Sequence, residues 1–299
     1  MIDLTLDPVT EARLVNRFGP GFHDWSAALP GLLERLSRRW DLEVVASVAA
    51  GGTSRAFHVR RAGGAAVLKL TPDPEIGVTE ATALRAWAGN AHVVSLIDSD
   101  GESGALLLEA VEPGDRVGRL PIEDAATLLR HLRLAEIPEG ALPTLRRRIG
   151  FLFELTVDRW RNGPAQEHLD PGLIERCRSA ALTLASDGPA GLVHGDLHPG
   201  NVLVGDRHGL VVIDPRPSIG DPAFDAVDWV LARATEVDEV EGNVTRLAAL
   251  VPALDPDRLM GWCRAAAVMI AVSRLNRGLH DQETRLLTEL AEASRPLPR

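Results

Sequence analysis

Residues 194–201 place two histidines, a carboxylate and an amide within one short stretch, in the order His-Gly-Asp-Leu-His-Pro-Gly-Asn. Apolar runs lie on both sides of it, which predicts a loop between two strands. A carboxylate such as Asp196 can accept the proton of an attacking hydroxyl group. The amide oxygen of Asn201 can bind a divalent cation without adding charge. The stretch therefore predicts acid–base chemistry beside a metal ion.

The two histidines have a second interpretation. His194 and His198 are spaced so that two imidazoles would share one helical face, where they could hold zinc. Two glycines and a proline in the same stretch disfavour the helix that such a pair needs. We therefore expect His194 to hold the loop through hydrogen bonds and His198 to cap a turn.

The stretch fits the kinase catalytic-loop template His-x-Asp-x-x-x-x-Asn, with Asp196 as the general base. A later apolar run ends in Asp214, where the template has a second carboxylate that binds magnesium together with Asn201. Arg216 follows closely enough to meet a phosphate or an acidic neighbour. The residues around Asp214 do not form Asp-Phe-Gly, and Ala-Pro-Glu is missing, so a protein kinase is disfavoured.

Residues upstream of this stretch predict a nucleotide site. Lys69 closes an apolar strand and suits a lysine that reaches the α- and β-phosphates, and Glu80 on the following helix can pair with it. The backbone of Glu109 and Val111 is expected to hold adenine. Small residues at a strand-to-strand turn can bring N–H groups close to phosphate oxygens, and here they are Gly51, Gly52, Thr53 and Ser54. The chain has no Gly-x-x-x-x-Gly-Lys-Ser/Thr sequence, which excludes an ordinary P-loop.

Hydrophobic periodicity predicts the elements that must position these residues. We expect strands at 44–48, 55–60, 65–70, 93–97 and 105–109, and helices at 30–40 and 75–87, the first starting at Pro30. After a break at 112–114, we expect helices at 121–135, 142–162 and 170–186, strands at 192–194, 202–204 and 210–213, and helices in the remainder. This order predicts an α+β architecture of two lobes. Residues 1–113 form a β-rich nucleotide-binding lobe, and residues 114–299 form a helical catalytic and acceptor-binding lobe.

Composition narrows the class of protein. The 299 residues are 45% hydrophobic, which predicts a globular protein with a substantial core. The net charge of −10 disfavours nucleic acid and favours a small cationic substrate. No stretch is apolar enough for a membrane helix and no basic signal peptide begins the chain, so a cytoplasmic protein without a membrane partner is expected. Cys177 and Cys263 lie in helical patterns and are expected to be core thiols.

The motif at 194–201, with Ile-Asp-Pro-Arg-Pro at 213–217 and Gly-Asp-Pro-Ala-Phe-Asp at 220–225, resembles the aminoglycoside phosphotransferase branch of the kinase-like fold. More narrowly, segments 22–25, 51–55, 67–71 and 106–109 resemble the aminoglycoside/hydroxyurea group, which includes streptomycin 6-phosphotransferases. The resemblance covers most of the chain and implies a bilobal protein-kinase-like fold. It also implies ATP-dependent phosphorylation of a small hydroxylated molecule, with the 6-hydroxyl of streptomycin as the best guess. Streptomycin carries two guanidinium groups, which suits an acidic protein.

The same resemblance assigns several residues. It implies Asp196 as the base and Asn201 and Asp214 as magnesium ligands, and it implies that Asp225 anchors the catalytic loop from beneath. Asp221 stands at an apparent helix start, where it is expected to cap free N–H groups. Asp228 is expected on a plain helix surface.

Other functions fit parts of the same pattern. One is a kinase of hydroxyurea or of another small hydroxylated metabolite. A different class is a non-catalytic kinase-like protein that binds a nucleotide without transferring phosphate, although the complete catalytic set disfavours it. ATP and Mg²⁺ are the expected cofactors, and the sequence does not exclude GTP. The sequence leaves the oligomeric state open, with a monomer slightly favoured.

Overall fold

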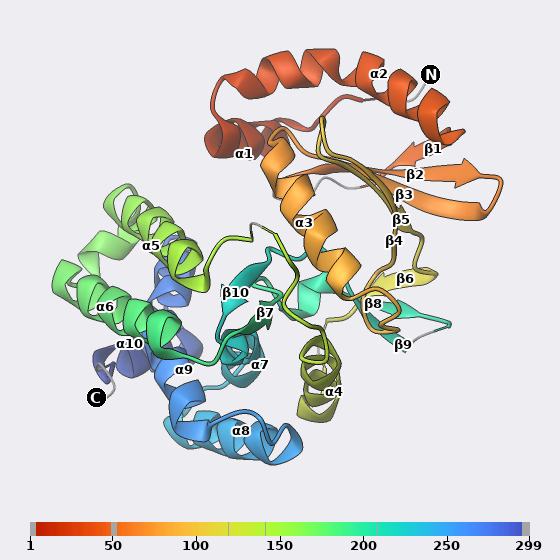
Figure 1. Cartoon of the computed structure of the whole chain (residues 1–299). Helices are drawn as coiled ribbons and strands as arrows, with labels where there is room; N and C mark the ends of the chain where they lie inside the picture. The colour runs from red at the N-terminus through yellow and green to blue at the C-terminus, as the bar shows by residue number, and fades with distance from the viewer. Residues whose placement is uncertain (1–3, 49–52, 119, 141, 208, 295–299) are drawn as a thin grey trace. The chain divides into compact units, whose positions relative to one another are not determined.

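The computed structural model, drawn in Figure 1, describes residues 4–48, 53–118, 120–140, 142–207 and 209–294. The chain forms two compact units. Unit 1 comprises Met1–Asp115 and Val204–Val211, and unit 2 comprises Arg116–Leu203 and Val212–Arg299. The sequence prediction assigned residues 204–211 to the second domain, whereas in the structure they belong to unit 1.

Unit 1 is built on a five-stranded sheet with the strand order β1-β2-β3-β5-β4. Neighbouring strands are antiparallel throughout. The strands are β1 (Glu43–Ser47), β2 (Arg55–Arg61), β3 (Gly64–Leu70), β4 (Leu96–Asp100) and β5 (Ala105–Glu109). The helices are α1 (Pro8–Phe18), α2 (Gly21–Trp40) and α3 (Pro74–Ala86). The β-rich character and the helix after β3 agree with the prediction, whereas α1 was not expected from the sequence.

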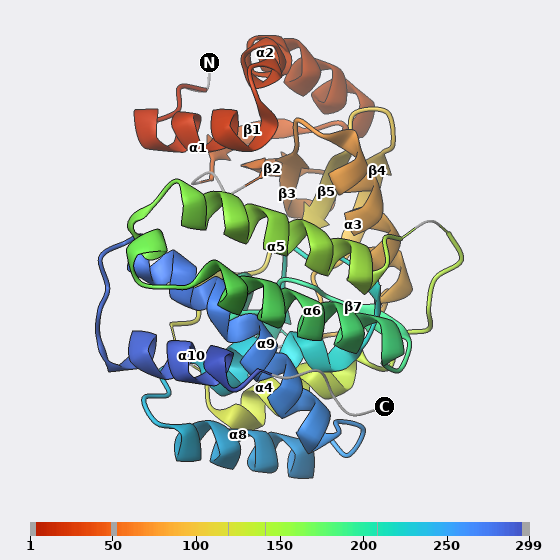
Figure 2. The same cartoon turned by 90° about the vertical axis from the view of Figure 1, so that its left-hand side faces the viewer.

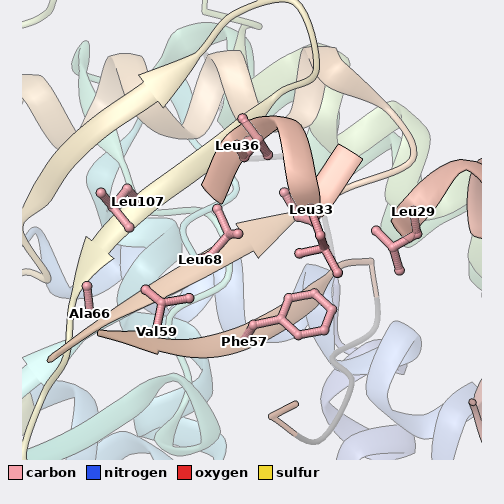
Figure 3. Packing of buried hydrophobic residues seen from close by; sticks show 10 residues of the cluster. Leu29, Leu33, Leu36, Phe57, Val59, Ala66, Leu68 and Leu107 are labelled. Atoms are coloured by element: carbon pink, nitrogen blue, oxygen red, sulfur yellow. The ribbon is translucent and has the colours of Figure 1, made fainter. Parts of the chain in front are cut away.

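The core of unit 1 lies between α2 and one face of this sheet. Leu29, Leu33 and Leu36 recur at helical spacing and form one apolar stripe on α2. Figure 3 shows this stripe over Phe57 and Leu68 of the sheet. Because alternate residues of a strand point to opposite faces, the residues between these core positions are directed away from α2.

That alternation places Lys69. Ala66, Leu68 and Leu70 of β3 are buried in the core beneath α2. Lys69 lies between two of them, so its side chain points to the opposite face of the sheet. Glu80 of α3 meets it there. The position of the lysine thus follows from the same period that builds the core.

Helix α2 differs from its prediction at its start. The expected helix began at Pro30, but α2 begins at Gly21 and carries Pro30 in its interior. Pro30 is exposed, while Phe22 and Leu29 on the same helix are buried. Burial of the long apolar stripe outweighs the hydrogen bond that an interior proline removes.

Two other predicted segments of unit 1 differ from the structure. The run expected as a strand at 93–97 overlaps the observed strand only at its end, because β4 begins at Leu96. Val93 is buried, and its N–H donates to the carbonyl of Asn90. The expected break at 112–114 contains the start of a strand, β6 (Pro113–Arg116), which follows a cis peptide bond at Pro113. A proline is tolerated there because it is the first residue of the strand.

Unit 2 is predominantly helical, as predicted. Its helices are α4 (Ile122–Leu132), α5 (Leu145–Arg161), α6 (Pro171–Asp187), α7 (Val227–Leu231), α8 (Val237–Leu250), α9 (Pro256–Leu275) and α10 (Gln282–Glu292). Short 3-10 turns lie at Pro164–Glu167, Pro199–Asn201 and Pro222–Ala226. The strands β7 (Gly191–Val193) and β10 (Ser218–Gly220) pair with each other, and β10 was not expected from the sequence.

Helix α9 forms the centre of unit 2. It contacts α5, α6, α7, α8 and α10, and the view in Figure 2 shows it crossing behind α5 and α6. Its buried residues occur on all sides, which is typical of a helix surrounded by other helices. Cys177 and Cys263 are buried free thiols, as the sequence predicted.

A third sheet has the strand order β6-β8-β9, with β8 at Val202–Gly205 and β9 at Gly209–Val212. The chain passes between the two units within these three strands. None of the described helices combines the length and the apolar character that crossing a membrane requires.

Candidate active site

In unit 2, residues 194–201 form the connection between β7 and β8. Gly195 has a φ of +75°, and a Cβ atom there would lie 2.2 Å from the carbonyl oxygen of Arg216. The backbone N–H of Arg216 in turn donates to the carbonyl of His194 at 2.8 Å. Only glycine allows this close approach of two backbone segments. The glycine of the motif therefore shapes the loop.

Two buried groups hold the backbone at the start of this loop. The carboxylate of Asp225 accepts the N–H groups of His194 and Gly195, each at 2.7 Å. The guanidinium of Arg148 on α5 donates to the carbonyl of Gly195 through Nε at 2.9 Å and Nη2 at 2.5 Å. Burial raises the pKa of the Asp225 carboxyl to about 7, although both N–H groups and Arg148 act to lower it. Asp225 thus bonds to the backbone of the loop at His194 and Gly195.

Asp196 and Asn201 lie together across the loop. The side-chain Nδ2 of Asn201 donates to the backbone carbonyl of Asp196 at 2.9 Å and to its Oδ2 at 3.2 Å. Because its nitrogen is used in this way, the amide oxygen of Asn201 is directed elsewhere. A carboxylate and an amide oxygen are thereby presented by one loop.

Asp214 follows β9 and approaches the other end of the loop. The N–H of Ile213 donates to the carbonyl of Asn201 at 2.9 Å, which brings the end of β9 beside Asn201. Asp214 has a φ of 59°, a left-handed conformation that aspartate tolerates better than most residues. Arg216 donates to Asp214 Oδ1 at 3.2 Å. Arg216 was expected to meet a phosphate or an acidic neighbour, and Asp214 is such an acidic neighbour.

The two histidines contact the backbone of the loop. His194 is fully buried, with Nε2 3.2 Å from the carbonyl of Ile213, and Nδ1 of His198 accepts the N–H of Gly200 at 3.1 Å. Burial lowers the pKa of His194 to about 3, against the charge of Asp214, which raises it. His194 is therefore a neutral imidazole inside the loop, and His198 caps the turn.

In unit 1, Lys69 and Glu80 form a buried ion pair. Lys69 Nζ lies 2.6 Å from both carboxylate oxygens of Glu80. The side chains are 10% and 1% exposed, so water screens the pair little. The ammonium group is fixed on the face of the sheet opposite α2.

The glycine turn before β2 is described only in part. Gly51 and Gly52 lie outside the described residues. Thr53 accepts a hydrogen bond from Thr71 Oγ1 at its carbonyl, at 3.1 Å, and Ser54 is buried. A phosphate-binding role for this turn stays a prediction.

The end of β5 carries the residues predicted to hold adenine. Glu109 accepts the N–H of Ser95 at Oε1, at 2.8 Å, and donates its own N–H to the carbonyl of Ser95 at 3.0 Å. Glu109 and Val111 line a pocket of about 380 Å³ within unit 1, together with residues of the β2–β3 and β8–β9 connections. The structure therefore places both residues beside a cavity.

Two residues of unit 2 that bear on the site were missed or misjudged from the sequence. Arg148 has no local signal, because an arginine on a helix far from the loop gives no indication of its partner. Asp228 was expected on a plain helix surface but is partly buried, close enough to Asp196 and His198 for their charges to act on it. Its spacing from Asp225, one helical turn, was the available signal. Asp221 caps the turn at Pro222–Ala226, as predicted.

The arrangement can now be compared with known proteins. Residues 39–278 match the family model described as aminoglycoside/hydroxyurea antibiotic resistance kinase. The chain is 33% identical to a hydroxyurea phosphotransferase of Kitasatospora aureofaciens, over 82% of this chain and 72% of the relative. It is 32% identical to a streptomycin 6-kinase of Streptomyces glaucescens, over 84% of each.

A solved structure shows the same fold. It is a thermostable mutant of aminoglycoside phosphotransferase APH(4)-Ia in a ternary complex with ADP and hygromycin B. It is 18% identical, with a TM-score of 0.54, over 87% of this chain and 96% of that one. The predicted α+β, protein-kinase-like fold class is therefore confirmed.

Proposed function

The chain belongs to the aminoglycoside/hydroxyurea antibiotic resistance kinase family, and from this premise we propose that it transfers the γ-phosphate of ATP to the 6-hydroxyl of streptomycin. The observation that carries the proposal is the loop of unit 2, where Asn201 contacts Asp196 and where the backbone of Ile213, the residue before Asp214, bonds to Asn201. The relative at 32% identity named streptomycin 6-kinase supports the acceptor. The ADP complex of the solved structure supports the nucleotide.

Asp196 is the catalytic base in this proposal. Its carboxylate accepts the proton of the acceptor hydroxyl, whose oxygen attacks the γ-phosphorus as the bond to the β–γ bridging oxygen breaks and ADP leaves. The contact with Asn201 orients the carboxylate before the acceptor binds. Asp225, Arg148 and the neutral His194 position the loop and exchange no proton with substrate.

The oxygen donors of the loop fit magnesium. Asn201 directs its nitrogen to Asp196, so its amide oxygen is not used in that contact. An amide oxygen and the carboxylate of Asp214 are ligands of the kind that Mg²⁺ prefers. The remaining ligands would be phosphate oxygens and water. When bound, the ion neutralises charge on the phosphates during transfer. Arg216, which pairs with Asp214, is suited to contact the same phosphates.

Unit 1 supplies the nucleotide contacts of the proposal. Lys69, fixed by Glu80, binds the α- and β-phosphates, and the turn of Thr53 and Ser54 contributes backbone N–H groups. The backbone of Glu109 and Val111 binds adenine. The sequence does not exclude GTP, so both nucleotides belong in the assay.

A second acceptor is favoured by a specific observation. The relative at 33% identity is a hydroxyurea phosphotransferase, and hydroxyurea is small and neutral. The chain has a net charge of −10, which favours the cationic streptomycin over a neutral acceptor through long-range attraction. Streptomycin is therefore the first candidate and hydroxyurea the second.

A coupled ADP-release assay tests the proposal. Mg²⁺ with ATP or GTP is supplied together with streptomycin, hygromycin B or hydroxyurea, and the position of the phosphate is read by mass spectrometry and NMR of the product. We expect release with streptomycin and phosphate on the 6-hydroxyl. Release with hydroxyurea alone would replace the first candidate by the second.

Asp196→Asn provides the blank. We expect kcat to fall by roughly 10²–10⁴-fold, because the variant cannot accept the hydroxyl proton. Nucleotide affinity, measured by calorimetry, should stay within about twofold, since the base does not bind the phosphates. Full activity in this variant would show that another group is the base.

A further inference from the structure

Three aspartates of unit 2 lie close together in the sequence and have different surroundings. Asp221 precedes the turn at Pro222–Ala226, Asp225 lies within it, and Asp228 lies in the first turn of α7. The first two are buried, whereas Asp228 is partly exposed. Their hydrogen-bond partners show what each carboxylate does.

Asp221 and Asp225 are fully engaged within the protein. Asp221 Oδ2 accepts from Arg258 Nε at 2.5 Å and from Trp262 Nε1 at 2.7 Å, and its Oδ1 accepts the N–H of Ala223. Asp225 uses both oxygens on the backbone of the catalytic loop. Both residues therefore serve the fold and the loop, and neither has an oxygen left for a ligand.

Asp228 is different. Among the residues that the structure describes, none donates a hydrogen bond to its carboxylate. Asp225 and Asp228 are three residues apart on consecutive helical turns, so both face the same side, and Asp225 contacts the catalytic loop. Asp196 and His198 of that loop are the charged neighbours of Asp228. The unpaired carboxylate therefore lies on the same side as Asp225, the side that contacts the catalytic loop.

The loop offers no partner that would satisfy this carboxylate. His198 uses Nδ1 to accept the N–H of Gly200, and no ion pair joins it to Asp228 in the described residues. Asp196 carries a like charge. Burial raises the pKa of the Asp228 carboxyl to about 6, with His198 lowering it and Asp196 raising it. Two carboxylates in one partly buried site repel each other, and a cation bound beside them relieves that repulsion.

We propose that Asp228 is a specificity residue, which forms an ion pair with a guanidinium or ammonium group of the acceptor close to the hydroxyl that is phosphorylated. This inference rests on the proposed function, because it needs a cationic acceptor at the Asp196 site. A guanidinium can donate two parallel hydrogen bonds to a carboxylate, which would also orient the acceptor. Asp228 thus distinguishes charged acceptors from neutral ones.

The test compares a cationic and a neutral acceptor in the same variant. For Asp228→Asn we expect streptomycin affinity, measured by calorimetry with ADP present, and its kcat/KM to fall by roughly 10²-fold. Turnover of hydroxyurea, where the enzyme accepts it, should stay within about twofold. Asp228→Glu keeps the charge and should recover part of the streptomycin affinity.

Two controls separate a specific effect from a general one. Asp257→Asn removes the same charge at an exposed position in the first turn of α9, and it should leave streptomycin affinity within about twofold. Unfolding by urea and ATP affinity show whether Asp228→Asn is folded. If that variant does not fold, the test is made with Asp228→Glu and Asp228→Ser.

The outcomes for this inference and for the proposed function are distinguishable. Wild-type enzyme that binds streptomycin without phosphorylating it would refute the proposed function, while loss of that binding in Asp228→Asn would still support the role of Asp228. Unchanged streptomycin affinity in folded Asp228→Asn would overturn the inference. An equal loss for hydroxyurea and streptomycin, or no streptomycin binding by wild type, would overturn it as well.

Discussion

Unit 1 and unit 2 hold their charged residues in different ways. In unit 1, Lys69 and Glu80 satisfy each other through a side-chain ion pair with nitrogen–oxygen distances of 2.6 Å. In unit 2, the charged side chains of Asp225 and Arg148 bond to the backbone of the catalytic loop. The first arrangement fixes the position of one ammonium group. The second fixes the backbone of the loop that carries Asp196.

The difference has consequences for substitution. Removing one member of a side-chain pair leaves the other charge buried and unpaired. Removing a group that bonds to backbone leaves N–H or C=O groups unsatisfied and frees the loop to move. Loss of Lys69 should therefore have the largest effect on stability, and loss of Asp225 should affect both stability and the position of the catalytic loop.

The largest effect on stability is expected for Lys69→Met. The Glu80 side chain is only 1% exposed, and removing the ammonium group from such a buried ion pair typically destabilises a protein by about 3–5 kcal/mol. The double variant Lys69→Met/Glu80→Met removes both charges and should be more stable than the single one. Urea unfolding measures both, and a single variant as stable as wild type would contradict this account of unit 1.

An exposed pair in the same unit serves as the control. Arg38 and Glu34 on α2 lie 2.8 Å apart, with both side chains more than half exposed. Arg38→Met should change stability by less than about 1 kcal/mol, because water screens the pair. A loss as large as that of Lys69→Met would show that burial does not explain the difference.

A smaller loss of stability is expected for Asp225→Ala, at about 3 kcal/mol. Two backbone N–H groups of the catalytic loop would lose a charged acceptor. We expect kcat to fall as the loop becomes mobile, while ATP affinity changes little. Asp225→Asn retains one acceptor oxygen and should lie between this variant and wild type. If Asp225→Ala lost stability as expected but kept the kcat of wild type, Asp225 would support the fold without positioning the catalytic loop.

The smallest effect concerns the pH dependence of stability. The pKa of His194 is about 3 in the folded protein, below its ordinary value of 6.5 because the ring is buried. The unfolded chain therefore binds a proton between these values that the folded chain does not, and stability falls as pH is lowered.

Between pH 7 and pH 5 the free energy of unfolding should fall by about 2 kcal/mol more in wild type than in His194→Gln. Urea unfolding at the two pH values measures this difference. The same fall in both proteins would show that His194 is protonated inside the folded loop.

Local patterns in the sequence were sufficient for much of the fold and for the motif. Strand alternation around Lys69 and the helical spacing of Leu33 and Leu36 predict faces, because each reports contacts at a fixed short separation. The order of strands and helices predicted the fold class. The spacing of Asp196 and Asn201 pointed to two residues that contact each other in the structure, while the roles assigned to them and to Asp214 stay predictions.

Tertiary structure decided what depends on partners distant in the chain. Helix α2 continues across Pro30 because its apolar stripe is buried. Val93 is buried but lies before the start of β4. Arg148 contacts Gly195 from a different helix, and no sequence pattern encodes such a contact. The sequence around the aspartates at 221, 225 and 228 does not show which of them has hydrogen-bond donors nearby. Only the fold decides which carboxylate is satisfied inside the protein and which one, Asp228, keeps its charge for a ligand, because the donors come from helices and loops far along the chain.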